Sequence, residues 1–453
     1  MKKTTKAFVI AAPSSGAGKT TLTMGIIAAL RKRGLIVQPF KVGPDYIDPA
    51  YHSALAGRAC INLDSWMTSP EFVRDTFERH AADADVAVIE GVMGLFDGKD
   101  KESSSAHVAK LLGLPVLMVV DAKKAAQSTA ALLYGFEHFD PDLNVSGALF
   151  NCIASENHWN CVSDAVRSRC KSEIFGYLRK NPELILPERQ LGLLSAHEHG
   201  VPTEFIEKLV TEVEANIDLN ALLTHLPALE LATPAEAKVE AAGTRLGIAK
   251  DEAFCFYYQD NLDLLQQAGI ELVEFSPLYD THLPENVDGL YFGGGFPEEF
   301  AGTLAQNSSM LSAVRNFEGK IIAECGGLIY LCKDFTGLNG EVFELVGRIN
   351  GRIEMTEKLQ ACGYREVTFT NDTLLGPKGT VLRGHEFHWS KWSDQPKNFG
   401  ALQTGDRNWG IADENLLASY FHIHFGSNPR ALQHLKAVMT PSVRKTNLVD
   451  QLS

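Results

Sequence analysis

The chain has 453 residues, of which 45% are hydrophobic and 22% charged, and its formal net charge is −14. This length predicts two or three globular domains, each able to bury a core. The negative charge argues against a nucleic-acid-binding surface, which needs clustered basic residues. The longest apolar run, residues 111–120, contains Gly113 and Pro115 and is about half of a membrane span. We expect neither nucleic acid nor membrane as a partner.

The eight cysteines contain no C-x-x-C pair and show no regular metal-ligand spacing. Cys152, Cys161 and Cys170 are evenly spaced, but no paired His or Cys accompanies them, so we predict buried thiols. This cysteine usage favours a reducing, cytoplasmic compartment.

The first stretch with a chemical signature is residues 6–30, where a short apolar run leads into Pro-Ser-Ser-Gly-Ala-Gly-Lys-Thr and an apolar run at helical spacing. A strand, a small-residue loop and a helix N-terminus form a phosphate cradle, because backbone N–H groups and the helix dipole face the loop. The pattern departs from G-x-x-x-x-G-K-[ST] only at Pro13, and an ordinary helix cap is the alternative. The predicted ATP-binding residues here are Gly16, Gly18, Lys19, Thr20 and Thr21, with Thr20 also on Mg²⁺.

Polar residues follow the next predicted strands, residues 35–40 and 85–89. Lys41-Val-Gly-Pro-Asp-Tyr-Ile-Asp-Pro follows the first strand, and Glu90-Gly-Val-Met-Gly-Leu-Phe-Asp-Gly follows the second. Ligands of open parallel sheets lie at the carboxyl ends of strands, although a Pro-bounded turn is the alternative for the first segment. Glu90 is the Mg²⁺ candidate, and Asp97 lies on a glycine-flanked loop that could face a substrate.

Further strands are predicted at residues 115–120 and 145–150, and the latter ends at Asn151, a candidate contact to the nucleotide base. Strands that alternate with helical patterns predict a parallel α/β sheet. The pattern lapses into Pro, Ala and Glu around residues 225–244, where we place a linker. A second α/β series follows, with strands predicted at residues 245–249, 271–275, 289–292 and 320–323.

The last of these strands runs into Glu-Cys325-Gly-Gly, the pattern of a nucleophile elbow. A tight turn would expose the sulfur, and the following helix would favour the thiolate, whereas a small buried Cys is the alternative. The preceding strand ends in Gly-Gly-Gly-Phe-Pro-Glu, whose N–H groups can form an oxyanion hole. The predicted oxyanion-hole residues are Gly294, Gly295 and Gly326.

A base for this cysteine must come from elsewhere in the chain. A strand predicted at residues 418–421 places His422 and His424 on one face, and His385 and His388 form a second pair. Spacing alone does not choose among these four histidines.

The motifs PSSGAGKT, KVGPDYIDP, EGVMGLFDG, AECGGLIYL, RGHEFHWS and SYFHIHFGSNP together resemble the cobyrinate a,c-diamide synthase family over nearly the whole chain, in the same order. The resemblance implies glutamine-dependent, ATP-using amidation of tetrapyrrole side chains. It also implies a dethiobiotin-synthetase-like P-loop domain, residues 1–235, and a class I glutamine amidotransferase domain, residues 245–453. Some relatives act on nickel sirohydrochlorin or hydrogenobyrinate, and the motifs do not separate these.

By the same resemblance, Cys325 is the nucleophile that releases ammonia from L-glutamine, and His422 activates it. Many class I amidotransferases carry a Glu two residues after this His to orient it, but His424 stands there in this chain. Either a Cys–His dyad suffices or another group, such as Glu386, orients His422. Nascent ammonia needs shielding from water, so a path between the domains is expected.

In the other domain, the implied chemistry is phosphorylation of a macrocycle carboxylate by ATP, followed by ammonia attack, twice per macrocycle. Lys41 and Asn151 complete the ATP-binding set; Thr20, Asp45 and Glu90 hold Mg²⁺; and Tyr46, Asp48 and Asp97 face the substrate. A homodimer is one alternative for the assembly. The rival functions are cobyric acid synthase, cytidine triphosphate synthase and a P-loop switch ATPase, which usually carries a Lys at the position of Ser14.

Overall fold

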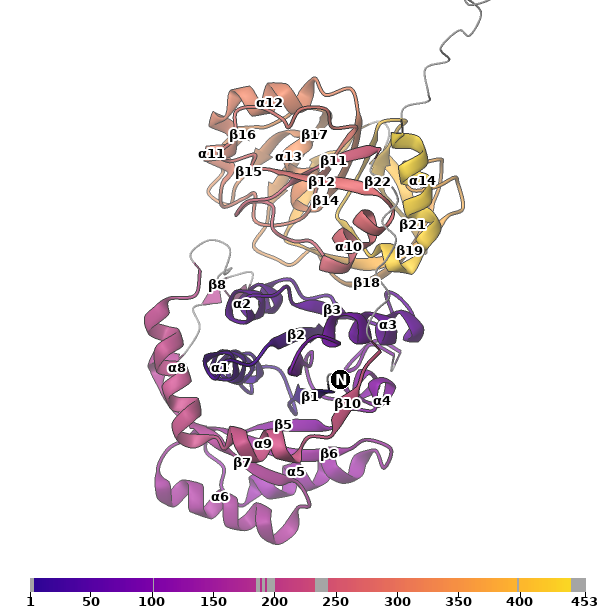
Figure 1. Cartoon of the computed structure of the whole chain (residues 1–453). Helices are drawn as coiled ribbons and strands as arrows, with labels where there is room; N and C mark the ends of the chain where they lie inside the picture. The colour runs from indigo at the N-terminus through magenta and orange to yellow at the C-terminus, as the bar shows by residue number, and fades with distance from the viewer. Residues whose placement is uncertain are drawn as a thin grey trace, which may run out of the picture. The chain divides into compact units, whose positions relative to one another are not determined.

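The computed structural model describes residues 4–100, 102–184, 200–232, 243–396 and 399–440, together with the backbone of 188–189 and 192–193. The chain divides into two compact units, Met1–Glu236 and Ala237–Ser453 (Figure 1). Within the described ranges, no helix combines the length and apolar character needed to cross a membrane.

The first unit is built on one sheet with helices on both faces (Figure 1). Its strands are β1 (Thr4–Ala11), β2 (Val37–Val42), β3 (Ile61–Leu63), β4 (Val86–Glu90), β5 (Val116–Asp121), β6 (Val145–Ile153), β7 (Glu173–Arg179) and β10 (Ala228–Glu230). Their order is β3-β2-β4-β1-β5-β6-β7, all parallel, and β10 adds antiparallel to β1. Phe8 and Ile10 of β1 join one core and Ala7 and Val9 the other, so both faces of the sheet are buried.

Serine capping residues begin three helices of this unit. The side chains of Ser69, Ser104 and Ser155 each accept a backbone N–H at a helix start, and Pro70 follows the first of them. The helices are α1 (Lys19–Lys32), α2 (Ile47–Ala56), α3 (Pro70–Ala81), α4 (Ser105–Leu112), α5 (Ser128–Phe139), α6 (Glu156–Arg169), α8 (Thr203–Asn216) and α9 (Leu219–His225), with a 3₁₀ turn η1 (Pro182–Leu184) and a separate pair β8 (Glu188–Arg189) and β9 (Gly192–Leu193).

Several details of this unit differ from the sequence prediction. The predicted linker, residues 225–244, contains β10, whose three residues pair with Thr4–Lys6; residues 233–242 lie outside the described part. Strand β6 continues past Phe150 to Ile153, because a bulge with Cys152 at φ 60° restores the pairing to β7. The prediction of three buried thiols was wrong, since Cys161 is exposed and Cys152 and Cys170 are only half-buried.

The second unit contains a ten-stranded mixed sheet and a small four-stranded sheet. The large sheet is formed by β11 (Thr244–Ala249), β12 (Ile270–Phe275), β13 (Gly289–Phe292), β14 (Lys320–Glu324), β18 (Ala361–Phe369), β19 (Val381–His388), β21 (Phe399–Thr404), β22 (Arg407–Ala412), β23 (Leu416–Ser419) and β24 (Phe421–Ile423). Its order is β12-β11-β13-β14-β23-β22-β21-β18-β19-β24, parallel as far as β23 and antiparallel beyond.

The predicted single strand at residues 418–421 is two strands, interrupted at Tyr420. Since β23 and β24 are separated by one residue yet lie far apart in the sheet order, the sheet curves until β24 returns beside β23 and β14. The remaining elements are α10 (Gln259–Gln267), α11 (Ala301–Gln306), α12 (Ser308–Arg315), α13 (Gly326–Leu331), β15 (Cys332–Thr336), β16 (Val342–Glu344), β17 (Ile349–Met355), β20 (Ser390–Asp394), η2 (Phe425–Ser427) and α14 (Pro429–Met439).

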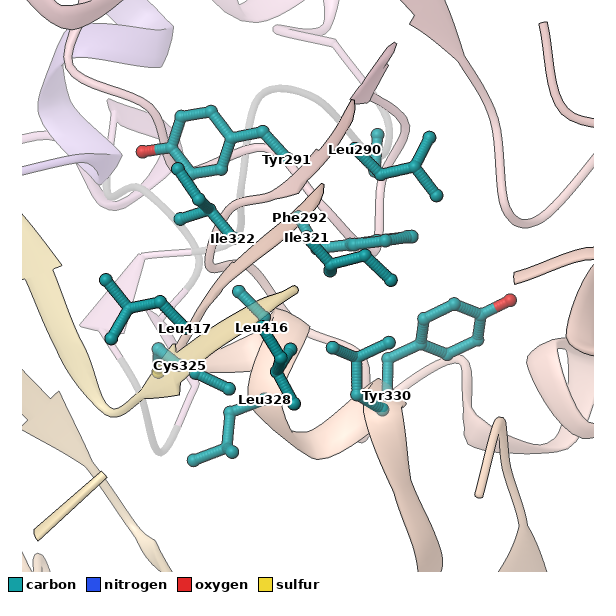
Figure 2. Close-up of a cluster of buried hydrophobic side chains, with 14 of the residues drawn as sticks. Leu290, Tyr291, Phe292, Ile321, Ile322, Cys325, Leu328, Tyr330, Leu416 and Leu417 are labelled. Atoms are coloured by element: carbon teal, nitrogen blue, oxygen red, sulfur yellow. The ribbon is translucent and has the colours of Figure 1, made fainter. Parts of the chain in front are cut away.

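Apolar side chains from the parallel strands and α13 pack around Cys325 (Figure 2). In Figure 2, Tyr291 and Ile322 project to one side of β13 and β14, and Leu290, Phe292 and Ile321 project to the other. This alternation is the period of a strand, and it fixes which residues of β14 face β24.

Candidate functional sites

A phosphate-sized cradle lies between β1 and α1. Gly16 and Gly18 have φ of 78° and 95°, values that favour glycine. A Cβ on Gly18 would lie 2.0 Å from Nδ2 of Asn151, and that amide donates a hydrogen bond to the carbonyl of Ala17 at 3.0 Å. Residue 18 must therefore be glycine for two reasons: its positive φ and its close contact with Asn151 of β6.

Side chains from three segments meet beside this loop. The Thr20 hydroxyl donates to Oε1 of Glu90 at 2.9 Å and lies 3.3 Å from Oδ2 of Asp48. The Lys41 ammonium lies 2.5 Å from Asp48, 2.9 Å from Glu90 and 3.6 Å from Asp45. The structure thus brings together Thr20, Lys41 and Glu90, which sequence reasoning had assigned to this site, and it adds Asp48 to their centre.

Charge pairing sets the ionisation of this cluster. Burial lowers the pKa of Lys41, but Asp48, Glu90 and Asp45 outweigh burial and hold its pKa well above the ordinary value. Burial raises the pKa of Glu90, but Lys41 and His52 outweigh it and lower the pKa. Burial and the neighbouring Asp45 raise the pKa of Asp48. Glu90 is therefore an anion that Lys41 neutralises.

His52 is a residue of this site that sequence reasoning missed. It is fully buried on α2, and its Nε2 lies 2.6 Å from Oε2 of Glu90. Oε1 of Glu90 meanwhile faces Thr20 and Lys41. His52 therefore fixes one carboxylate oxygen and directs the other into the cluster. A lone histidine inside a helix gives no sequence signal for such a contact.

Lys19 reaches across the loop, where its ammonium donates to the carbonyls of Met93 at 2.6 Å and Ser14 at 3.3 Å. A cavity of about 580 Å³ opens here. Its lining includes every residue assigned from the sequence to ATP and Mg²⁺, namely Gly16, Gly18, Lys19, Thr20, Thr21, Lys41, Asp45, Glu90 and Asn151. It also includes Lys123, Arg179 and Lys180, which we missed although they lie at or just beyond the carboxyl ends of β5 and β7.

The three residues assigned to the substrate have different surroundings. Asp48 lines the cavity among the charged groups described above. Tyr46 directly precedes α2 and is half-buried. Asp97 is exposed, and its Oδ2 accepts the N–H of Gly94 at 3.1 Å, so it stabilises the loop that carries Met93.

The second candidate site lies where β14 meets α13. Cys325 has φ 45° and ψ −96°, a strained conformation for a residue with a side chain. Its N–H donates to Ser419 of β23 at 2.7 Å, and its Sγ lies 3.7 Å from the carbonyl of Phe387 on β19. The strand-turn-helix geometry predicted for a nucleophile elbow is present.

The electrostatics around the sulfur differ from the sequence expectation of a stabilised thiolate. Burial, followed by the negative charge of Glu298, raises the pKa of Cys325 well above its ordinary value, and the N–H of Gly326 lowers it only in part. A buried thiol surrounded by carboxylates stays protonated at neutral pH. Its activation therefore requires a base that removes the proton when substrate is bound.

The glycine loop after β13 lies beside both the elbow and His422. A Cβ on Gly294 would lie 2.4 Å from Cε1 of His422, and one on Gly326 would lie 3.1 Å from the backbone N of Gly295. The Gly294 carbonyl accepts the N–H of Phe256 at 3.0 Å, so this loop is held against the segment that follows β11. The predicted oxyanion-hole glycines and the predicted base are therefore brought together.

The other three histidines have structural contacts. Nδ1 of His424 accepts the N–H of Gly426 at 3.2 Å, and burial lowers its pKa to about 4. His388 stacks on Tyr420 with ring centroids 3.7 Å apart. His385 is half-buried opposite His422 in the β19–β24 register. Of the four, His422 is the one beside the glycine loop.

Glu386, considered from the sequence as the group that orients the base, has other partners. Its carboxylate lies 2.8 Å from Arg365, 3.1 Å from Arg407 and 3.1 Å from His388. Burial raises the pKa of Glu386, but His388 and the two arginines outweigh it and hold the pKa at about 2. The carboxylate beside His422 is instead Glu324, whose Oε2 lies 3.7 Å from Nδ1 of His422.

Comparisons with known proteins agree with both halves of this architecture. Residues 8–193 match the CobQ/CobB/MinD/ParA nucleotide binding domain, and residues 245–430 match the CobB/CobQ-like glutamine amidotransferase domain. The cobyrinate a,c-diamide synthase of Priestia megaterium is 42% identical over 94% of this chain and 95% of its own length. This chain belongs to the cobyrinate a,c-diamide synthase family.

Other members of the cobyrinate a,c-diamide synthase family cover this chain equally well. The Listeria innocua member is 43% identical over 94% of this chain and 98% of its own length. The Salmonella typhimurium member is 41% identical over 94% of this chain and 97% of its own length. Because each match spans both units, family membership applies to the nucleotide-binding part and to the amidotransferase part together.

Proposed function

We propose that this chain uses ATP and L-glutamine to convert the a and c side-chain carboxylates of cobyrinate into amides. The observation that carries the proposal is the presence in one chain of a charged cavity beside the P-loop and a strained cysteine at a strand-helix turn, each inside its matching family domain. His422 contacts the glycine loop next to that turn. The relatives' names supply the substrate.

In residues 245–453, the Cys325 sulfur attacks the side-chain carbonyl carbon of glutamine. His422 takes the thiol proton and returns it to the departing nitrogen, so that ammonia leaves and a thioester remains. Water then releases glutamate and restores the thiol. The N–H groups of Gly294, Gly295 and Gly326 are the proposed donors to the oxyanion, each worth roughly 3 kcal/mol in the transition state.

In residues 1–235, a macrocycle carboxylate attacks the γ-phosphorus of ATP and gives an acyl phosphate and ADP. Ammonia then attacks the acyl carbon, and phosphate leaves. Gly16, Gly18, Lys19, Thr21 and Lys41 surround the phosphates, Asn151 contacts the nucleotide, and Tyr46, Asp48 and Asp97 face the macrocycle. This half of the reaction rests on position and charge neutralisation.

The donor set beside the loop fits Mg²⁺, because Thr20, Asp48 and Glu90 present only oxygen atoms and the Thr20 hydroxyl lies 3.3 Å from Asp48 and 2.9 Å from Glu90. Thr20, Asp45 and Glu90 would hold the ion. Bound there, Mg²⁺ would neutralise charge that develops on the phosphates.

The test is mass spectrometry of reactions that contain ATP, Mg²⁺, glutamine and one macrocycle at a time: cobyrinate, hydrogenobyrinate or nickel sirohydrochlorin. Each amidation lowers the mass by about one dalton, so two conversions on cobyrinate support the proposal. Conversion of a different macrocycle, or of carboxylates other than a and c, would contradict the substrate proposed here.

We also propose a cytoplasmic location, which the eight free cysteines favour, and a homodimer, which sedimentation would measure.

A further inference from the structure

A buried carboxylate that the mechanism above does not use lies directly before the nucleophile. Glu324 is the last residue of β14, and only 2% of its surface is exposed. A buried charge is costly unless neighbouring groups compensate for it. The contacts of Glu324 therefore indicate what this carboxylate does.

One oxygen of Glu324 is held by two donors. Oε1 accepts the hydroxyl of Tyr291 at 2.9 Å and the N–H of Ile423 at 3.2 Å. Tyr291 and Ile322 project from the same side of their strands in Figure 2, and Glu324 follows Ile322 at the strand period. The carboxylate is thus fixed on the face of the sheet that β24 covers.

The other oxygen faces the candidate base. Oε2 of Glu324 lies 3.7 Å from Nδ1 of His422, and Ile423, which holds Oε1, is the next residue of the same strand. Both oxygens therefore face residues of β24. A separation of 3.7 Å is slightly longer than a hydrogen bond, and such contacts commonly shorten when substrate binds.

Other charged and titratable groups lie near this histidine. Glu386 is engaged by Arg365, Arg407 and His388. Cys325, Glu298 and Tyr257 lie around the elbow, and His385 lies across the strand pair from His422. Glu324 lies within salt-bridge distance of His422.

We propose that Glu324 is the positioning residue that orients His422. By accepting the Nδ1–H, it leaves Nε2 as the atom that takes the thiol proton, and it stabilises the imidazolium that forms. The inference rests on the proposed roles of Cys325 and His422. It places the acidic group immediately before the nucleophile, whereas His424 occupies the position two residues after the base.

The experiment compares Glu324→Gln with the wild-type chain by glutamate formation across a pH series. The Gln side chain of this variant keeps an oxygen that can accept hydrogen bonds from Tyr291 and Ile423, but it lacks the negative charge. We expect kcat to fall about 10- to 100-fold, KM for glutamine to stay nearly constant, and the acid limb of the pH–rate profile to move to lower pH because the imidazolium loses its anion. Glu324→Asp should recover part of kcat, and the exposed control Glu274→Gln should match the wild type.

Ammonia-driven amidation distinguishes a misoriented His422 from a misfolded protein, because this reaction does not need the cysteine site. It should be unchanged in Glu324→Gln. An unchanged kcat, or a reduced kcat with an unmoved acid limb, would overturn the inference while leaving the proposed function in place. Glutamate formation that survives Cys325→Ala would instead overturn the proposed function.

Discussion

The two candidate sites of this chain are built in opposite ways. The site beside the P-loop is a compact group of charged side chains, in which Lys41 contacts Asp48 and Glu90 and a buried histidine fixes one oxygen of Glu90. The site at Cys325 depends on backbone geometry: a strained residue, a glycine loop and a thiol whose pKa burial raises. Phosphate chemistry needs fixed charge, whereas acyl transfer needs hydrogen-bond donors that the backbone holds in place.

The difference also concerns when each site becomes reactive. The P-loop site carries its charges already paired, so ligands enter a preorganised environment. The thiol site holds a protonated sulfur and gains its nucleophile when a base acts. Variants that affect only one of the two sites can test this separation.

The largest effect is expected from Cys325→Ala. Removal of the sulfur should reduce glutamate formation at least about 1,000-fold, because no covalent intermediate can form. Amidation driven by ammonia should continue, since it uses the other site. The exposed Cys362→Ala is the matched control and should behave as the wild type. If Cys325→Ala also abolished ammonia-driven amidation, the two sites would not be separable.

The converse variant is Lys19→Ala. Loss of this ammonium should lower ATP-dependent amidation about 100-fold or more with either nitrogen source, because a preorganised charge on the phosphates is missing. Glutamate formation measured without ATP should persist. Lys208→Ala on the surface of α8 is the control. Equal amidation rates in Lys19→Ala and the control would contradict the assignment of the cavity.

A steric variant examines the backbone-built site. Gly294→Ala would place a methyl group 2.4 Å from Cε1 of His422, so the ring must move. We expect glutamate formation to fall about 10- to 100-fold, because a displacement of about 1 Å is that costly in a catalytic constellation. Gly302→Ala, whose added methyl meets nothing closer than 3.7 Å, should leave the rate unchanged. Similar rates for the two variants would contradict the proposal that the glycine loop positions His422.

The smallest effect concerns stability rather than rate. Burial lowers the pKa of His424 to about 4 from 6.5, so the unfolded chain takes up a proton that the folded chain refuses as pH falls through this window. The folded state should therefore lose stability between about pH 6.5 and 4, by an amount on the order of 3 kcal/mol. In His424→Asn, which keeps an acceptor near Gly426, Tm should fall less between pH 7 and 4.5. An identical fall in both proteins would assign the acid sensitivity to other groups.

Buried parallel strands were the features best predicted from the sequence, because such strands are continuous apolar runs. The strand predicted at residues 289–292 has the observed bounds of β13, and the turn at Cys325 follows from two glycines after an apolar strand. Short, half-polar elements lack this signal and were missed: neither β10 nor the bulge at Cys152 carries a continuous apolar run.

Some side-chain contacts at the two sites could be predicted from the sequence, and others could not. Lys41 and Glu90 could be brought together from the sequence, since both end strands of one parallel sheet. Glu324 and His422 could not, because their contact depends on how far the second sheet curves before β24 returns to β14. Spacing within a motif carries no information about that curvature.

Strand β10 has a mechanical consequence. It pairs with Thr4–Lys6, the opposite end of β1 from the phosphate loop, and the ammonium of Lys6 also donates to the carbonyl of Leu226 at 2.7 Å. With about 3.3 Å per residue, this attachment lies roughly 20 Å from Ala12 along the strand. Tension that reaches the first unit through β10 would thus load the end of β1 remote from the nucleotide, and the loop that holds the phosphates would be spared.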